Sequence, residues 1–209
     1  TLKEFNNDIT AVRQFLTDSI RDYRIKQGLG VVARFSTETY NDAIWFARLG
    51  NGSIGGKARG LAFMNHILQK YSLYNEWENV RVMVPRTLVI TTEYFDRFII
   101  ENGLQYVVNA DLSDSEILSE FVASSLPQEL MDSLRVFIHH VKKPLAVRSS
   151  SKLEDSYYQP FAGIYSTYMI PHTENEDQEL RLLSKAIKSV YASVYFASSR
   201  AYITATANV

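Results

Sequence analysis

The sequence predicts an α/β fold in which strands and helices are mixed along the chain. The same pattern is compatible with an α+β fold. Apolar residues recur at spacings of three and four in several segments, which is typical of helices with one buried face. Short apolar runs, such as residues 80–92 and 144–147, lie between those segments and predict strands. Glycine and proline separate the two kinds of segment. This alternation predicts layered helices and sheet.

The first element is an amphipathic helix over residues 3–26, which Gly28 and Gly30 end. Its apolar face consists of Phe5, Ile9, Val12, Leu16, Ile20 and Tyr23. It either joins an upstream domain or packs on the domain that follows, and the pattern leaves both readings open. A short strand and then a short helix are expected within residues 31–49. Residues 1–50 therefore form a helix and linker segment, and residues 51–209 form the main domain.

A loop rich in glycine follows at residues 50–56 and leads into a helix from about Lys57 to Tyr71. Residues 80–92 are rich in β-formers, but Pro85 removes a ladder donor, so an edge strand or a break into two strands is expected. Thr91 or Thr92 caps a helix that runs through Asn102.

The second half predicts three more helices and two strands. Ser113 and Glu116 form a capping box that opens a helix, and Pro127 starts the next one, which runs to about residue 141. Residues 145–147 form a short strand, and residues 164–170 form another. One long helix is expected from Asp177 to about Ala205.

Composition excludes several kinds of function. The 209 residues are 46% hydrophobic and carry a net charge of −1, so nothing indicates binding to nucleic acid or to an anionic membrane. The chain has no cysteine, which excludes disulfides and thiolate chemistry and fits the cytoplasm. Four scattered histidines lack metal-site spacing, so no metal ligand is assigned in this chain. The absence of an initiating Met suggests a fragment of a longer protein.

Lys57 is the first candidate for binding chemistry. It stands with Arg59 in the first turn of a helix, where peptide dipoles already contribute positive charge. An anion would relieve this repulsion, and backbone N–H groups of Gly55 and Gly56 are expected to converge on the same point, which favours a phosphate. On this motif alone, the alternative that both cations extend into water stays open.

Arg148 is the second candidate. It ends an apolar strand and precedes Ser149 and Ser150, so a guanidinium and two hydroxyls are expected at the ligand edge of the sheet. The alternative is a structural ion pair with Glu154 or Asp155. Two further positions, Gly163 and Thr167, would allow close backbone approach and supply a hydroxyl.

The order of these motifs resembles the N-terminal ATP-binding, ATP-grasp-like domain of the phosphoenolpyruvate synthase and pyruvate phosphate dikinase family. The resemblance covers about residues 50–206. It rests on Ile54-Gly-Gly-Lys57, Val84-Pro85 leading to Val89-Ile90-Thr91-Thr92, Ala146-Val-Arg-Ser-Ser150, Phe161-Ala-Gly163, and Ser199-Arg200-Ala201-Tyr202 in a late helix. The sequence departs from the pattern in two motifs. Ile164 and Ser166 replace a glutamine and an acid, and Pro85-Arg86-Thr87-Leu88 replaces Pro-Pro-Gly-Phe.

The resemblance implies that Lys57 and Arg148 contact ATP phosphates as the catalytic cations. The supporting nucleotide contacts would be Gly55, Gly56, Ser149, Ser150, Gly163 and Thr167. It also implies Mg²⁺ held by residues beyond this chain, a phosphohistidine carrier domain as partner, and a pyruvate-like acceptor. The implied function is phosphate transfer from Mg-ATP in the full-length protein, the fragment alone being inactive. A nucleotide-sensing module without turnover is the alternative, and the oligomeric state stays open, a homodimer included.

Overall fold

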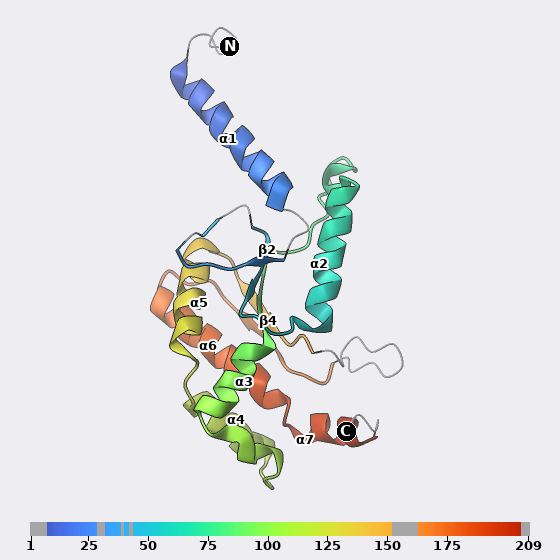
Figure 1. Cartoon of the computed structure of the whole chain (residues 1–209), viewed down its shortest axis with the longest axis vertical. Helices are drawn as coiled ribbons and strands as arrows, with labels where there is room; N and C mark the ends of the chain where they lie inside the picture. The colour runs from blue at the N-terminus through green and yellow to red at the C-terminus, as the bar shows by residue number, and fades with distance from the viewer. Residues whose placement is uncertain (1–7, 29–31, 39, 42–43, 152–162, 206–209) are drawn as a thin grey trace.

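Two small sheets and the helices around them make up the structure, a computed structural model that describes residues 8–28, 32–38, 40–41, 44–151 and 163–205 (Figure 1). The predicted mixture of helices and strands is confirmed. Among these described residues, no helix has the length and apolar content needed to cross a membrane.

The first sheet is parallel and has the strand order β1-β2-β3. Its strands are β1 (Ala33–Arg34), β2 (Phe46–Leu49) and β3 (Thr87–Ile90). The predicted short helix before residue 50 is wrong, because β2 occupies its second half. Phe46 and Ala47 are both buried although they face opposite sides of the strand. A strand covered on both faces loses the polar alternation by which strands are recognised, and its short apolar run resembles a buried helix.

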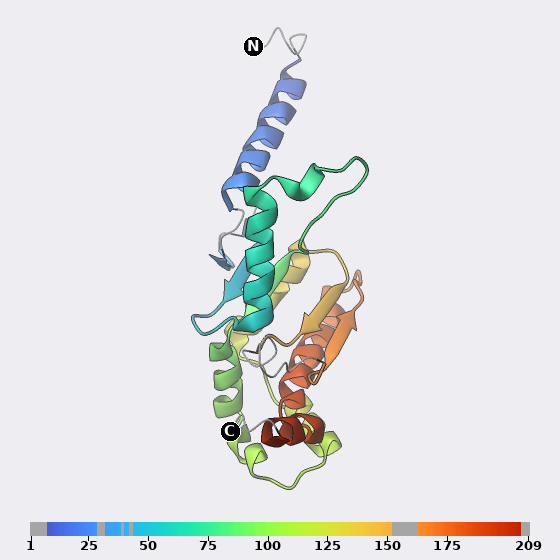
Figure 2. The same cartoon turned by 90° about the vertical axis from the view of Figure 1, so that its right-hand side faces the viewer.

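Helices cover both faces of this sheet (Figures 1 and 2). Helix α2 (Gly55–Lys70) packs its Ala58 against Phe46 and Val89 on one face. The main core lies on the other side and includes residues of α3 (Thr92–Glu101), α4 (Asp114–Ala123), α5 (Gln128–His140) and α6 (Glu176–Ser193). Two short 3-10 helices lie in the connections: η2 (Leu73–Asn75) between α2 and β3, and η3 (Leu104–Val108) between α3 and α4.

The second sheet pairs β4 (Leu145–Arg148) with β5 (Thr167–Ile170) in an antiparallel register. Both strands contact α6. Strand β5 is shorter than the predicted 164–170. Strand β3 lies at an edge of its own sheet, as Pro85 predicted, and the segment before Pro85 makes only an isolated bridge at Val80.

Most predicted helix starts are confirmed. The capping box of Ser113 and Glu116 opens α4, and Thr91 stands at the N-cap of α3. The long C-terminal helix is instead two helices, α6 and α7 (Ala197–Ala205). The break has a tertiary cause, because the carboxylate of Asp114 accepts a hydrogen bond from the backbone N–H of Ala197 at 2.8 Å and caps α7.

Helix α1 (Ile9–Gly28) confirms the predicted N-terminal helix within its described residues, and residues 3–7 lie outside them. It extends away from the body that the two sheets form (Figure 2). Its apolar positions Ile9, Leu16 and Ile20 are all more than half exposed. Over these positions the helix therefore does not pack on the domain that follows.

Candidate functional site

The glycine loop connects the end of β2 to the start of α2. Gly50 has a φ of +84°, and a side chain there would collide with Thr91 at the start of α3. The loop is held on the same helix by Ser53, whose backbone N–H donates to the Thr92 hydroxyl at 3.1 Å. These contacts place the loop at the carboxyl edge of the parallel sheet, which is where ligands of such sheets bind.

The segment that follows β4 packs directly on the start of α2. The Ser150 hydroxyl donates to the backbone oxygen of Ile54 at 2.8 Å and accepts from the backbone N–H of Ala58 at 2.9 Å. The backbone N–H of Gly56 donates to the carbonyl oxygen of Ser151 at 3.1 Å. We call these contacts between residues 54–58 and 150–151 the helix–loop junction. It brings together two segments about 90 residues apart in the sequence.

Gly55 makes the helix–loop junction possible. Its φ is +75°, a conformation that residues with a side chain rarely adopt. A Cβ atom at this position would overlap the backbone carbonyl of Ser150. Gly55 is therefore required for the contact between residues 54–58 and residues 150–151.

Lys57 and Arg148 are carried by the two segments that the junction joins. Lys57 lies half-buried in the first turn of α2, and Arg148 is exposed at the carboxyl end of β4. Thr167 is the register partner of Arg148 on β5 and is exposed as well. The strand end and the helix start that sequence reasoning singled out thus lie next to each other.

Several supporting residues are used differently from the expectation. The backbone N–H groups of Gly55 and Gly56 bond to protein oxygens, those of the Ser53 side chain and the Ser151 backbone, rather than pointing jointly at an open site. The Ser150 hydroxyl is likewise engaged in the junction. These three residues fix the geometry of the site.

Of the remaining predicted residues, Ser149 is half-buried, and Gly163 is exposed with a φ of +77° and open space where a side chain would be. The predicted alternative partners of Arg148, Glu154 and Asp155, lie outside the described residues, as does Phe161.

Sequence reasoning missed one cation near this site. Arg48 is the second-last residue of β2, and its guanidinium donates to the carbonyl oxygen of Gly50 in the glycine loop at 2.8 Å. With Arg59 it lines an open hollow of about 410 Å³. The lining residues of this arginine hollow are Val32, Arg48, Gly52, Ser53, Ile54 and Arg59. An arginine two residues before a glycine-rich loop was the signal that could have identified it.

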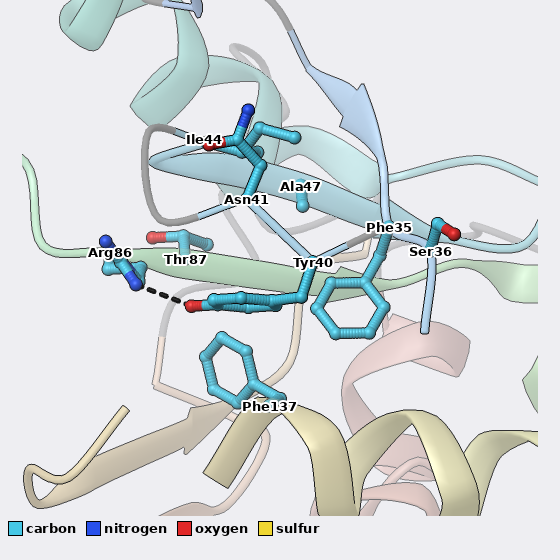
Figure 3. A pocket seen from close by; sticks show the side chains of 9 residues that line it. All are labelled: Phe35, Ser36, Tyr40, Asn41, Ile44, Ala47, Arg86, Thr87 and Phe137. Carbon is cyan, nitrogen blue, oxygen red and sulfur yellow. Dashed lines mark hydrogen bonds between the residues drawn. The ribbon is translucent and has the colours of Figure 1, made fainter. Parts of the chain in front are cut away.

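A second pocket lies on the other side of the sheet and is too small for a nucleotide. Its volume is about 20 Å³, enough for roughly one water molecule (Figure 3). Arg86 donates to the Tyr40 hydroxyl at 2.6 Å and lies 5.0 Å from the Trp45 ring centroid. The departure of Arg86 from the family motif is therefore accommodated by contacts within the fold.

The positions and partners of the described histidines and acids bear on whether these residues could form a metal site. Within the described ranges, no cluster of three or more His, Asp or Glu side chains is positioned to hold an ion. His139 pairs with Glu176, His172 with Glu179, and the His140 ring stacks on a tyrosine. His139, His140 and His172 thus make contacts within the fold.

The fold and the motifs define a nucleotide-binding domain of the dikinase kind. Residues 51–207 match the family described as pyruvate phosphate dikinase, AMP/ATP-binding domain. The chain belongs to this family, and it is an ATP-binding domain of that type.

One curated relative shows the same kinship. The chain is 28% identical over 170 residues to a phosphoenolpyruvate synthase of Aeropyrum pernix, a match that covers 71% of this chain. It spans only 18% of that relative's length. No solved structure gives a significant match.

Proposed function

We propose that this domain binds ATP with its phosphates between Lys57 and Arg148 and supplies a phosphoryl group for transfer in a longer, phosphoenolpyruvate-synthase-like protein. The observation that carries the proposal is the helix–loop junction. It holds the helix start bearing Lys57 against the segment that follows Arg148. Two cations on adjacent segments suit a polyphosphate, because each can offset the negative charge of phosphate oxygens. Neutral hydrogen-bond donors would leave that charge in place.

The two cations have distinct tasks in this proposal. The guanidinium of Arg148 offers a planar fork that can engage two phosphate oxygens and fix their orientation. Lys57 places a compact charge beside the N-terminus of α2, where the helix dipole adds to the attraction. Together they position the nucleotide and stabilise charge that develops during transfer. Thr167, opposite Arg148 in the register, adds a hydroxyl on the same strand pair.

Further elements of the proposal come from the family. The domain is the first half of an ATP-grasp-like cleft and occupies residues 51–209. The phosphoryl group passes to a phosphohistidine on another domain and then to a pyruvate-like acceptor. The family also implies Mg²⁺, whose ligands we propose to lie outside this chain on the basis of that resemblance.

A nucleotide-sensing module is the second candidate. It is favoured by Ile164 and Ser166, which stand where the family has polar and acidic residues. Ile164 is half-buried, and the backbone N–H of Ser166 donates to the Ser193 hydroxyl at 3.3 Å. The segment just before β5 is therefore held against the end of α6. Such a module would bind ATP with the same two cations but would not release ADP or AMP.

Two measurements test the proposal. Lys57→Ala and Arg148→Ala should each weaken ATP binding to this domain about tenfold or more, because each removes a charge-assisted contact of roughly 1.5–3 kcal/mol. Both should abolish labelling of the full-length protein by γ- or β-labelled ATP. Unchanged ATP affinity in both variants would refute the site. Binding without any labelling of the intact protein would favour the sensor.

A further inference from the structure

The arginine hollow lies on the first turn of α2, beside the helix–loop junction. Arg59 reaches it from α2, and its Nε donates to the carbonyl oxygen of Gly55 at 3.1 Å. Arg48 reaches it from β2. The junction also contacts Gly55 through Ser150, so the hollow and the junction meet at this glycine.

The two guanidinium groups are positioned by neutral acceptors. Each bonds to a backbone carbonyl of the glycine-rich segment, which orients the group without cancelling its charge. In the part of the chain that the structure describes, neither arginine forms an ion pair with a carboxylate; the basic side chains that do so there are Arg97, Arg135, His139 and His172. The described lining of the hollow contains no acid.

Two other charged residues lie near the pair. Arg34 is the register partner of Arg48 on the adjacent strand and adds to the positive potential. Glu93 bonds to the glycine loop, where its Oε2 accepts from the backbone N–H of Asn51 at 2.6 Å, and it is not among the residues that line the hollow.

We infer that Arg48 and Arg59 form a second phosphate-binding pair, separate from Lys57 and Arg148. Each arginine keeps N–H groups beyond the one that bonds to a carbonyl, and planar guanidinium groups match the oxygens of a phosphate. The hollow is wide and open to solvent, with a volume of about 410 Å³, so a phosphate or pyrophosphate can enter it directly. The phosphate belongs either to the nucleotide's polyphosphate chain, in which case the inference rests on the proposed function, or to a free phosphate or pyrophosphate.

The test uses inorganic pyrophosphate as the probe, measured by titration calorimetry on the whole chain. Arg48→Gln and Arg59→Gln should each raise the Kd for pyrophosphate about tenfold or more, as expected for losing one charge-assisted contact. Arg48→Lys, which keeps the charge, should retain part of the affinity. Arg13→Gln on the exposed face of α1 is the matched control for the change in net charge and should alter the Kd less than about twofold.

The outcomes separate the possibilities. Competition between ATP and pyrophosphate for the Arg48/Arg59 pair identifies nucleotide phosphates as the ligand, and binding of pyrophosphate to the ATP-saturated chain identifies free phosphate. If Lys57→Ala leaves ATP binding unchanged while the Arg48 and Arg59 variants lose pyrophosphate, the proposed function fails and this inference stands. No pyrophosphate binding by the unaltered chain, or an equal loss in Arg13→Gln, overturns the inference.

Discussion

Replacing Gly55 by alanine tests whether the helix–loop junction holds the site together. The added Cβ would overlap the carbonyl of Ser150 and lie 2.6 Å from its hydroxyl oxygen, whereas real Cβ atoms essentially never come within 3.0 Å of another atom. The obstacle is backbone, so it cannot be relieved by a side-chain rotation. The left-handed φ of +75° adds strain of roughly 1–2 kcal/mol for a residue with a side chain.

The size of the effect follows from the bonds that would be lost. Three hydrogen bonds cross the junction, two through the Ser150 hydroxyl and one from Gly56 to Ser151. At about 1 kcal/mol each, their loss together with the strain lowers the free energy of unfolding by about 4–5 kcal/mol. ATP affinity should fall with it, because the segment after Arg148 is no longer held against the helix that carries Lys57.

Gly60 provides the matched control on the same helix. An added Cβ there meets no atom within 4 Å, and its backbone is helical, so Gly60→Ala should stabilise the domain by about 0.5–1 kcal/mol. Urea unfolding followed by circular dichroism and calorimetric titration with ATP measure the two quantities. Equal stability and equal ATP affinity in Gly55→Ala and the unaltered chain would refute the reasoning.

Two further predictions concern stability away from the site. Hydrogen bonds from Ser113 lower the pKa of Glu116, so this carboxylate stabilises the fold above its unfolded pKa of about 4.5, and the contribution is lost as pH falls through the lower folded-state value. Ser113→Ala should reduce the decline in unfolding free energy below pH 4.5, and an identical pH profile in acid urea titrations would contradict this. The Lys188 ammonium donates to the carbonyl oxygens of Val122 and Ser124, so Lys188→Met should cost about 1–2 kcal/mol in thermal unfolding, while Lys185→Met on the exposed face should cost little.

Local signals in the sequence predicted those elements whose causes are local. The capping box of Ser113 and Glu116 marks the start of α4, because both partners lie within one turn. Strand β2 was mistaken for helix because neighbours cover both of its faces, which removes the alternation that reveals a strand. The division between α6 and α7 depends on Asp114, 83 positions before the N–H that it caps, and no local pattern encodes such a contact.

The sequence singles out Lys57 and Arg148, and their role as phosphate-binding cations stays a prediction that follows from positive charge at a helix start or a strand end. The contacts of Gly55 could not be predicted from the sequence. A glycine that allows a left-handed backbone and a glycine that allows close approach to Ser150 look the same there. Arg48 was overlooked because it precedes the glycine loop and its importance depends on Arg59 lying across the hollow.

The single hydroxyl of Ser150 has a consequence for how the domain could respond to its ligand. It donates to the backbone at the start of α2 and accepts from the N–H of Ala58, 92 positions away, so it ties the segment after β4 to the helix that follows β2. The two sheets also share one core, so this hydroxyl fixes the position of one segment and does not by itself hold the sheets together. Under the proposed function, a nucleotide spanning Lys57 and Arg148 would join the same two segments, so that ATP binding and an intact helix–loop junction would stabilise each other.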